Sequence, residues 1–301
     1  MRTIDYSWYL PPFPEYNEAQ SAAVPFLDKD MNLVISFATA AGKTVLAECY
    51  FGYHLTVKPE CRVGYVCPFK SLASEKRQEW EGESQLAKYG LALWTSDSGE
   101  DDNPATARLV VDTLESFDSK TRSERWESWI RSMDCVAFDE AHVIGGSRGG
   151  AMEAAMMRLV EANPEVRLVL LSATMGNALE IAKWVKSLNG KPTKCITSSW
   201  RPTRIDMKAC GVSGYDERVE KAVELAGRSC SKKTLVFVHS KVTGAEIVRR
   251  LRKTGVRAAF HNASLSGAKR RRVEEAFNDP SSGLNIVVST STLGAGVNMG
   301  G

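Results

Sequence analysis

The sequence NLVISFATAAGKTVLAE, at residues 32–48, decides the fold of this chain of 301 residues. It begins with a short apolar run that predicts a buried strand, continues through small residues, and then places Lys43 and Thr44 at the head of an amphipathic segment. A strand, a turn of small residues and a Lys-Ser/Thr pair that opens a helix are typical of a phosphate-binding loop. Backbone N–H groups close around phosphate oxygens in such a loop, so its side chains must be small. The helix N-terminus adds the positive end of its dipole.

The residue types of this stretch suit that chemistry. Lys43 would place positive charge on the β- and γ-phosphates, and Thr44 would offer a hydroxyl to Mg²⁺. The general pattern G-x-x-x-x-G-K-[ST] requires glycine where this chain has Phe37. Taken alone, the stretch therefore also fits a strand-to-helix turn of an unrelated α/β domain.

Length and composition describe a globular protein with two domains of ordinary size. Hydrophobic residues make up 43% of the chain and charged residues 25%. No apolar run is long enough for a transmembrane helix, and residues 1–20 lack the apolar core of a secretory signal. The seven cysteines form no C-x-x-C pair and the four histidines have no metal-site spacing. We expect reduced, mostly buried thiols in a cytoplasmic protein with no membrane partner.

The net charge of +3 conceals an asymmetry between the two parts of the chain. Residues 1–200 carry 21 Lys+Arg and 27 Asp+Glu, a net charge of −6, whereas residues 201–301 carry 18 and 9, a net charge of +9. A basic second part is compatible with binding a phosphate backbone. A solvated basic helix face explains any single basic cluster equally well.

A second decisive stretch is CVAFDEAH, at residues 135–142. Four apolar residues predict a strand, with Asp139 and Glu140 at its carboxyl end, where open α/β sheets bind ligands. Asp139 is suited to hold Mg²⁺, and Glu140 to orient and deprotonate an attacking water. Two adjacent carboxylates are costly unless a cation partners them, so the pair itself predicts a cation.

Strand and helix patterns alternate along the chain and then restart. Apolar strand patterns recur at 62–68, 89–97, 109–111, 167–174 and 233–240. Residues 256–266 read as a strand and loop, and residues 285–299 as a strand that leads into a Gly-rich loop. This alternation predicts an α/β protein with two tandem doubly wound parallel sheets. We expect the first unit over residues 1–198 and the second over residues 199–301, with residues 196–210 crossing from one to the other. Trp126 and Trp129, at helical spacing, are better explained by core packing or by a surface-helix anchor than by base stacking.

In this order, the motifs resemble those of the superfamily-two helicases, and more finely those of the superkiller-like DExH branch, which includes the archaeal DNA-repair helicase and the polymerase-theta helicase domain. The resemblance spans nearly the whole chain. Its motifs are TAAGKT-x-L-A-E (39–48), P-x-K-S-L-A-S-E-K (68–76), D-E-A-H-x-I (139–144), S-A-T (172–174), W-R-P (200–202), F-V-H-S (237–240), F-H-N-A-S-L-S-x-x-x-R-x-x-V-E-x-x-F (260–277) and S-T-L-G-A-G-V-N (291–298).

The resemblance implies two RecA-like domains and a role for each motif. Gln20, which without it is only a polar residue on a short predicted helix over residues 17–27, would read adenine. Nucleotide-binding residues would be Gln20, Thr39, Ala40, Ala41, Gly42, Lys43, Thr44, Gly296 and Asn298, with Thr44 and Asp139 on the metal. Lys43, Asp139 and Glu140 would be catalytic, and His142, Ser172 and Thr174 would couple the nucleotide site to the nucleic-acid track. Residues that hold one strand's backbone would be Pro68, Lys70, Ser71, Thr95, Thr113, Glu115, His239, Ser240, His261, Asn262 and Thr290. A purely structural role is the alternative for some of them, Glu115 especially.

The implied activity is that of an ATP-dependent helicase or translocase. It would use ATP and Mg²⁺ and move 3′-to-5′ on single-stranded or forked nucleic acid, with DNA favoured over RNA. ATP would bridge the two domains, hydrolysis would release the bridge, and the grip of each domain on one strand would change in turn. Contacts to the backbone carry little sequence information, which suits such movement.

The sequence departs from the family at its end. The last family motif, Q-x-x-G-R-A-G-R, and the winged-helix and ratchet-helix domains do not occur in these 301 residues. We therefore expect a second sheet that is incomplete at its C-terminus. We also expect weak activity of the chain alone, because arginine fingers contribute on the order of a thousand-fold in rate.

Three explanations for this departure stay open. The chain would be a fragment, one half of a split helicase completed by a second polypeptide, or a regulatory relative that binds nucleic acid without efficient hydrolysis. The intact Lys43, Asp139 and Glu140 argue against the last of these. A small-molecule kinase or transport ATPase is disfavoured by the second α/β unit and its basic charge.

Overall fold

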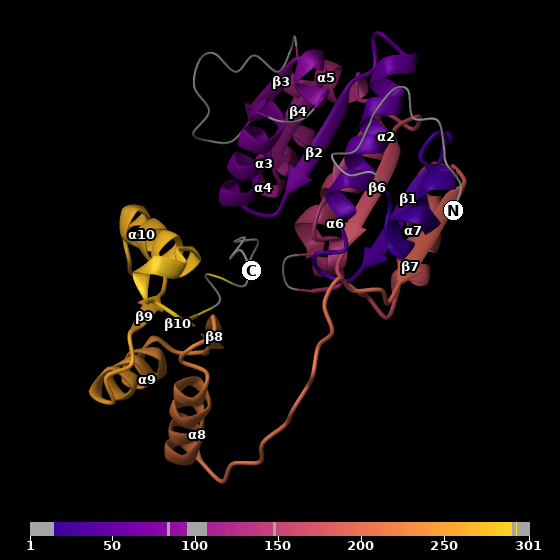
Figure 1. The fold of residues 1–301 in the computed structure, drawn as a ribbon. Helices are drawn as coiled ribbons and strands as arrows, with labels where there is room; N and C mark the ends of the chain where they lie inside the picture. Colours follow the sequence, from indigo (N-terminus) through magenta and orange to yellow (C-terminus); the bar gives the residue numbers. More distant parts are fainter. Residues whose placement is uncertain (1–14, 83–84, 95–106, 147–148, 291–292, 294–301) are drawn as a thin grey trace. The chain divides into compact units, whose positions relative to one another are not determined.

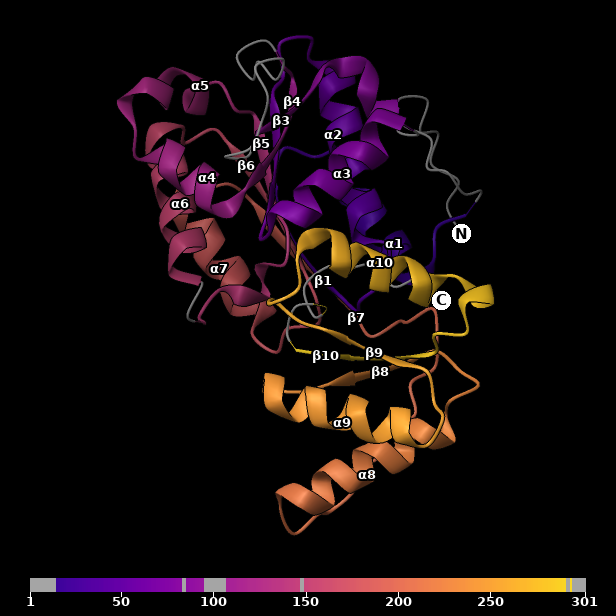
Figure 2. The same cartoon turned by 90° about the vertical axis from the view of Figure 1, so that its left-hand side faces the viewer.

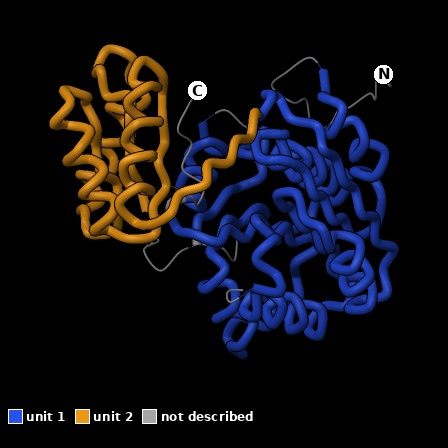
Figure 3. The backbone as a smooth tube through the Cα atoms, turned by 90° about the horizontal axis from the view of Figure 1, so that it is seen from below, with its two compact units in different colours: residues 1–205 blue, residues 206–301 orange. Residues whose placement is uncertain are grey.

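In a computed structural model, the chain divides into two compact units, Met1–Ile205 and Asp206–Gly301, which Figure 3 colours separately. The structure describes residues 15–82, 85–94, 107–146, 149–290 and 293, without the side chains of Ser71 and Trp94. The boundary lies in residues 199–214, which form neither helix nor strand. Each unit is an α/β layer structure in its own right.

The first unit is built on a parallel sheet of seven strands in the order β3-β4-β2-β5-β6-β1-β7 (Figure 1). The strands β2, β4 and β5 are buried along their whole length, as expected for a sheet covered on both faces. The strands are β1 (Asn32–Phe37), β2 (Val63–Cys67), β3 (Leu91–Trp94), β4 (Leu109–Thr113), β5 (Cys135–Phe138), β6 (Arg167–Ser172) and β7 (Thr193–Ser198).

Helices cover both faces of this sheet (Figure 2). One face carries α1 (Glu18–Ala23), α2 (Lys43–Val57) and α3 (Lys70–Gly82), which bury the first apolar cluster. The other carries α4 (Leu114–Thr121), α5 (Glu127–Arg131), α6 (Gly149–Ala162) and α7 (Ala178–Asn189), which bury the second. Trp129 packs in the second cluster with Trp126 beside it, as the core interpretation of that pair predicted. Short 3-10 turns lie at Val24–Phe26, Gln85–Tyr89, Glu124–Trp126 and Ala141–Val143.

The second unit has a smaller parallel sheet of three strands in the order β8-β10-β9. Two helices pack on one face and one on the other (Figure 2). The edge strand β8 leaves Leu235 and Phe237 exposed, at 38% and 56% of their surface. The elements are α8 (Tyr215–Arg228), β8 (Thr234–Phe237), α9 (Lys241–Lys253), β9 (Ala258–His261), α10 (Gly267–Asn278), a 3-10 turn (Pro280–Ser282) and β10 (Ile286–Ser289).

The predicted fold class is confirmed, since both sheets are parallel and doubly wound. One strand was not predicted. Residues 193–198, part of which the sequence placed in a segment crossing between units, form β7 and pair with the whole length of β1. Only Ile196 of β7 is buried, so the strand lacks the apolar run that identified the others. Within the described residues, no helix combines the length and apolar character needed to cross a bilayer.

Candidate nucleotide and nucleic-acid site

The loop after β1 has the backbone of a phosphate-binding turn. Ala40 and Gly42 have positive φ angles of 63° and 76°, and α2 begins directly at Lys43. Glycine is required at position 42 for a second reason, since a Cβ atom there would collide with the Gln20 amide. Phe37, the departure from the general pattern, is the last residue of β1 and is fully buried in the core. The Phe37 side chain therefore packs in the core beside the sheet. The backbone conformations that favour glycine occur instead at Ala40 and Gly42.

Gln20 and Asn17 brace this loop from α1. Asn17 caps the helix in a reciprocal capping box with Gln20, as the predicted helix start implied. The Gln20 Nε2 donates to the Gly42 carbonyl at 3.3 Å, and the Asn17 Nδ2 donates to the Ala41 carbonyl at 3.2 Å. Gln20 is almost completely buried. The structure thus shows it supporting the loop, and adenine recognition by its amide is left as a proposal.

The two acids lie at the end of β5, as predicted. Asp139 is buried, its Oδ2 accepts a hydrogen bond from the Tyr65 hydroxyl at 2.7 Å, and its Oδ1 accepts one from the Glu140 N–H at 2.8 Å. Glu140 has a left-handed backbone, with φ 53° and ψ 40°. A non-glycine residue in that region costs about 1–3 kcal/mol, so the surrounding structure must impose it. His142 Nδ1 lies 3.1 Å from Glu140 Oε2.

Lys43 and the two acids lie within each other's electrostatic field. Burial lowers the pKa of Lys43, and the charges of Glu140 and Asp139 oppose that shift. Burial, together with the Asp139 charge, raises the pKa of Glu140, and His142 and Lys43 oppose it. The Lys43 Nζ donates to the carbonyls of Phe37 at 3.4 Å and Ala38 at 3.3 Å, so the ammonium lies over the loop. A carboxylate with a raised pKa suits a general base near neutral pH.

The donors at this place fit a hard divalent cation. Thr44 and Asp139 offer oxygen atoms, and the Asp139 carboxylate accepts a hydrogen bond from the Tyr65 hydroxyl. Mg²⁺ prefers one or two protein oxygens with water and phosphate oxygens completing its shell. The described residues contain no group of three or more His, Cys, Asp or Glu side chains arranged for a metal.

The Ser-Ala-Thr segment is joined to the β1 side of the sheet. Ser172 is buried at the end of β6 and Thr174 is exposed. Ser36, which the sequence analysis did not select, donates from its Oγ to the Ala173 carbonyl at 3.1 Å and accepts from the Met175 N–H at 2.9 Å. A polar residue inside the otherwise apolar run of β1 was the available signal. Ser36 thereby links the strand before the phosphate loop to the segment predicted to couple the two sites.

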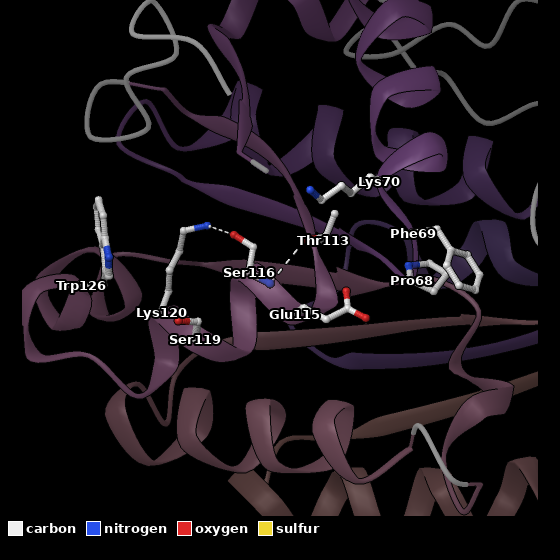
Figure 4. Close-up of a pocket in the computed structure, with 9 residues that line it drawn as sticks. All are labelled: Pro68, Phe69, Lys70, Thr113, Glu115, Ser116, Ser119, Lys120 and Trp126. Atoms are coloured by element: carbon white, nitrogen blue, oxygen red, sulfur yellow. Dashed lines mark hydrogen bonds between the residues drawn. The ribbon is translucent and has the colours of Figure 1, made fainter. Parts of the chain in front are cut away.

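Four of the predicted nucleic-acid residues line one cavity of about 600 Å³ (Figure 4). These are Pro68, Lys70, Thr113 and Glu115. They meet because β2 and β4 are neighbours, with Cys67 opposite Thr113, so that the turns after both strands lie at one edge. Thr113 caps α4 by accepting from the Ser116 N–H at 3.4 Å. Thr95 lies outside the described residues, as does the side chain of Ser71.

The far part of this cavity was not predicted. Its wall includes Ser116, Ser119, Lys120 and Trp126 (Figure 4). Lys120 is buried and bonds Asp112 Oδ2 at 2.5 Å and Ser116 Oγ at 2.7 Å. Burial raises the pKa of Asp112 to about 6 against the opposing pull of Lys120, and burial also lowers the pKa of Lys120. Asp112 lies in β4 and Lys120 lies eight residues later in α4. The two residues therefore have no helical spacing by which the sequence would have predicted the pair.

In the second unit, the predicted residues follow the carboxyl ends of its three strands. His239 and Ser240 are exposed after β8, and Ser240 caps α9 by accepting from the Thr243 N–H at 3.1 Å. Asn262 Oδ1 accepts from the Ser264 N–H at 2.9 Å, and the Thr290 N–H donates to the His261 carbonyl at 3.3 Å.

His261, the last residue of β9, makes a side-chain contact to a helix of this unit. It is buried, as Asn262 is, and its Nε2 lies 2.9 Å from Glu274 Oε1 on α10. Its ring is therefore engaged within the unit. Gly296 and Asn298 lie outside the described residues.

This fold and site define a P-loop protein of the nucleoside-triphosphate-binding class, with a second parallel α/β unit. Residues 17–181 match the family model of the DEAD/DEAH box helicases, and residues 217–301 match the helicase conserved C-terminal domain. The chain belongs to the DEAD/DEAH box helicase family.

Similar proteins agree with this assignment. The chain is 29% identical to the "ATP-dependent DNA helicase Hel308" of Thermoplasma volcanium over 95% of its own length and 45% of the relative's. It is also 29% identical to the Hel308 of Pyrococcus horikoshii, over 95% of this chain and 44% of that one. The chain thus spans under half the length of these relatives.

Solved structures share the fold. Dbp5 of S. cerevisiae, solved with RNA and ADP BeF3, matches with a TM-score of 0.67 at 20% identity over 93% of this chain and 71% of that chain. The DUF1998 helicase MrfA, solved with DNA, matches with a TM-score of 0.69 at 18% identity over 94% of this chain and 43% of that chain.

Proposed function

We propose that this chain is the ATP-hydrolysing core of a Hel308-like helicase, which couples hydrolysis to 3′-to-5′ movement on single-stranded nucleic acid, with DNA favoured over RNA. One observation carries the proposal. Lys43 at the start of α2 and the acids Asp139 and Glu140 at the end of β5 interact electrostatically beside a loop with the backbone of a phosphate site.

The chemistry follows from these side chains. Lys43 neutralises charge on the phosphates of ATP. Thr44 and Asp139 supply the protein oxygens of a Mg²⁺ site, and bound Mg²⁺ would stabilise charge on the phosphate oxygens. Glu140 orients the attacking water and accepts its proton, for which its raised pKa prepares it. His142 contacts Glu140 through its Nδ1. It would couple changes at that carboxylate to the segment that contains Ser172 and Thr174.

Nucleic acid would occupy the cavity beside β2 and β4. Its wall offers Lys70, the Thr113 hydroxyl and the turn at Pro68, which suit a sugar-phosphate backbone. Such contacts read no base sequence, as a translocating protein requires. In the second unit, the residues after β8, β9 and β10 would hold the same strand, with the ring of His261 acting within the unit.

The finer parts of the proposal rest on the family resemblance. We include weak hydrolysis by the chain alone, a role in DNA repair in the cytoplasm, and the division at residue 198. The alternative is a nucleic-acid-binding regulatory or split-helicase subunit without efficient ATPase of its own. Retention of Glu140 in a backbone conformation that costs energy favours the hydrolytic proposal, because a binding module gains nothing from it.

The test is steady-state ATP hydrolysis with and without single-stranded DNA or RNA, beside Lys43→Ala and Glu140→Gln. We expect stimulation by nucleic acid, and a loss of about a hundred-fold or more in each variant, with nucleotide binding lost only in Lys43→Ala. Nucleotide binding without turnover would favour the alternative. Failure to bind either nucleotide or nucleic acid would contradict both functions. Unwinding of 3′-tailed against 5′-tailed duplexes tests the direction.

A further inference from the structure

Tyr65 occupies a position in the first unit that neither sequence motif nor catalytic role explains. It lies in β2 between β4 and β5, and its side chain is fully buried. Its hydroxyl donates to Asp139 Oδ2 at 2.7 Å. Burial raises the pKa of this hydroxyl well above its ordinary value, and Thr44 is among the residues that oppose the rise. The hydroxyl is thus bound to one residue assigned to the metal and lies in the electrostatic surroundings of the other.

The direction of the Tyr65 bond has a chemical consequence. A tyrosine hydroxyl has one proton, which it donates to Asp139 Oδ2, so the bond fixes the orientation of that carboxylate. The other oxygen of Asp139 accepts from the Glu140 N–H at 2.8 Å, so the carboxylate is fixed from two sides.

The tyrosine ring is itself held firmly. It packs edge-on against Trp80, with ring centroids 5.1 Å apart, and against Phe51 at 6.5 Å. Trp80 Nε1 donates to Glu48 Oε1 at 2.7 Å, which ties α3 to α2. The hydroxyl is therefore fixed relative to α2, the helix whose first turn carries Lys43 and Thr44.

We propose that Tyr65 is a positioning residue, whose hydroxyl orients the Asp139 carboxylate toward a divalent cation. The inference rests on the proposed function and adds a residue to it. Burying a hydroxyl costs free energy that phenylalanine would not, and the ring packing would be the same for either residue. Among the described residues, the hydrogen-bond partner of the hydroxyl is Asp139, a candidate metal ligand.

The test compares Tyr65→Phe with Tyr50→Phe in the whole chain. Tyr50 is a matched control, because it too is fully buried, and its hydroxyl donates to the Met31 carbonyl at 2.9 Å, outside the metal-ligand set. Binding of a fluorescent ATP analogue is measured in EDTA and across a Mg²⁺ titration. Thermal melts of both variants check that each one folds.

We expect both variants to bind the nucleotide without metal as the unchanged chain does. Only Tyr65→Phe should need more Mg²⁺ for half-maximal binding, by about tenfold, the scale typical for residues that orient metal ligands. An equal Mg²⁺ midpoint in the two variants would overturn the inference while leaving Lys43-dependent nucleotide binding intact. Absence of nucleotide binding by the unchanged chain, or binding that survives Lys43→Ala, would overturn the proposed function itself.

Discussion

At the scale of single residues, buried polar groups decide both chemistry and stability. His54 shows the stability side. It lies buried in α2 between the rings of Tyr50 and Tyr53, and within the described part of the chain its Nε2 has no hydrogen-bond partner. Burial, with a smaller effect of the Arg167 charge, lowers its pKa to about 3.

This lowered pKa predicts an acid-sensitive fold. The unfolded chain binds a proton at His54 below its ordinary pKa of 6.5, whereas the folded chain does so only near 3. Stability from the neutral form is therefore complete above 6.5 and falls as the pH drops toward 3, by about 2 kcal/mol between pH 7 and pH 5. Urea unfolding at both pH values measures it. His54→Phe should flatten the slope, and the exposed His239→Asn should not; an unchanged slope in His54→Phe would contradict the assignment.

Sequence patterns predicted some single residues of the site but not the contacts of others. The positions of Lys43, Asp139 and Glu140 could be predicted because each follows a strong strand pattern. Tyr65 could not, since it lies inside a strand pattern and meets Asp139 only through sheet pairing. Ser36 stood out only as a polar residue in an apolar run, and its partners likewise depend on sheet pairing. The environment of Gln20 was likewise invisible, because its amide contacts depend on how α1 lies against the loop.

At the scale of elements, close approach between helix and sheet sets the packing of the second unit. Gly244, in α9, lies over β9 so closely that a Cβ atom there would meet the ring of Phe260 and come within 3.1 Å of Val238 Cγ2. A side chain at this position would force the helix away from the sheet.

Gly244→Ala should therefore destabilise this unit by about 1–3 kcal/mol, the usual cost of overpacking. Gly227→Ala, in α8, is the control, since a Cβ atom there meets nothing within 4 Å. That change should be neutral or slightly stabilising, because alanine favours helix more than glycine does. Denaturant unfolding of both variants gives the comparison. Equal stabilities would show that α9 shifts without cost.

Elements were predicted well where the pattern was strong. Strands with continuous apolar runs were all found, whereas β7 was missed, because only one of its six residues is buried. Its place is fixed by pairing along β1, which is a non-local interaction that hydrophobic periodicity does not encode.

At the scale of the whole molecule, the two units are joined by a segment without helix or strand. Residues 201–210 of that segment are all exposed. Arg204 and Lys208 offer trypsin sites there, while Arg201 precedes a proline and does not.

Limited trypsin digestion should therefore make its first cut within the described residues after Arg204 or Lys208. Intact mass measurement identifies the products, and circular dichroism of the separated pieces should show folded α/β structure in each. Arg204→Gln with Lys208→Gln should slow that cut. A first cut inside a described strand or helix would contradict the division into two units.

The backbone of Glu140 has a consequence for anyone who redesigns this protein. Selection for heat resistance alone would reward Glu140→Gly, because glycine adopts the left-handed conformation without the cost that glutamate incurs. The same change would delete the proposed base. A thermostability screen without an activity measurement would thus select variants that have lost the proposed base. Position 140 should therefore be held constant in any such library.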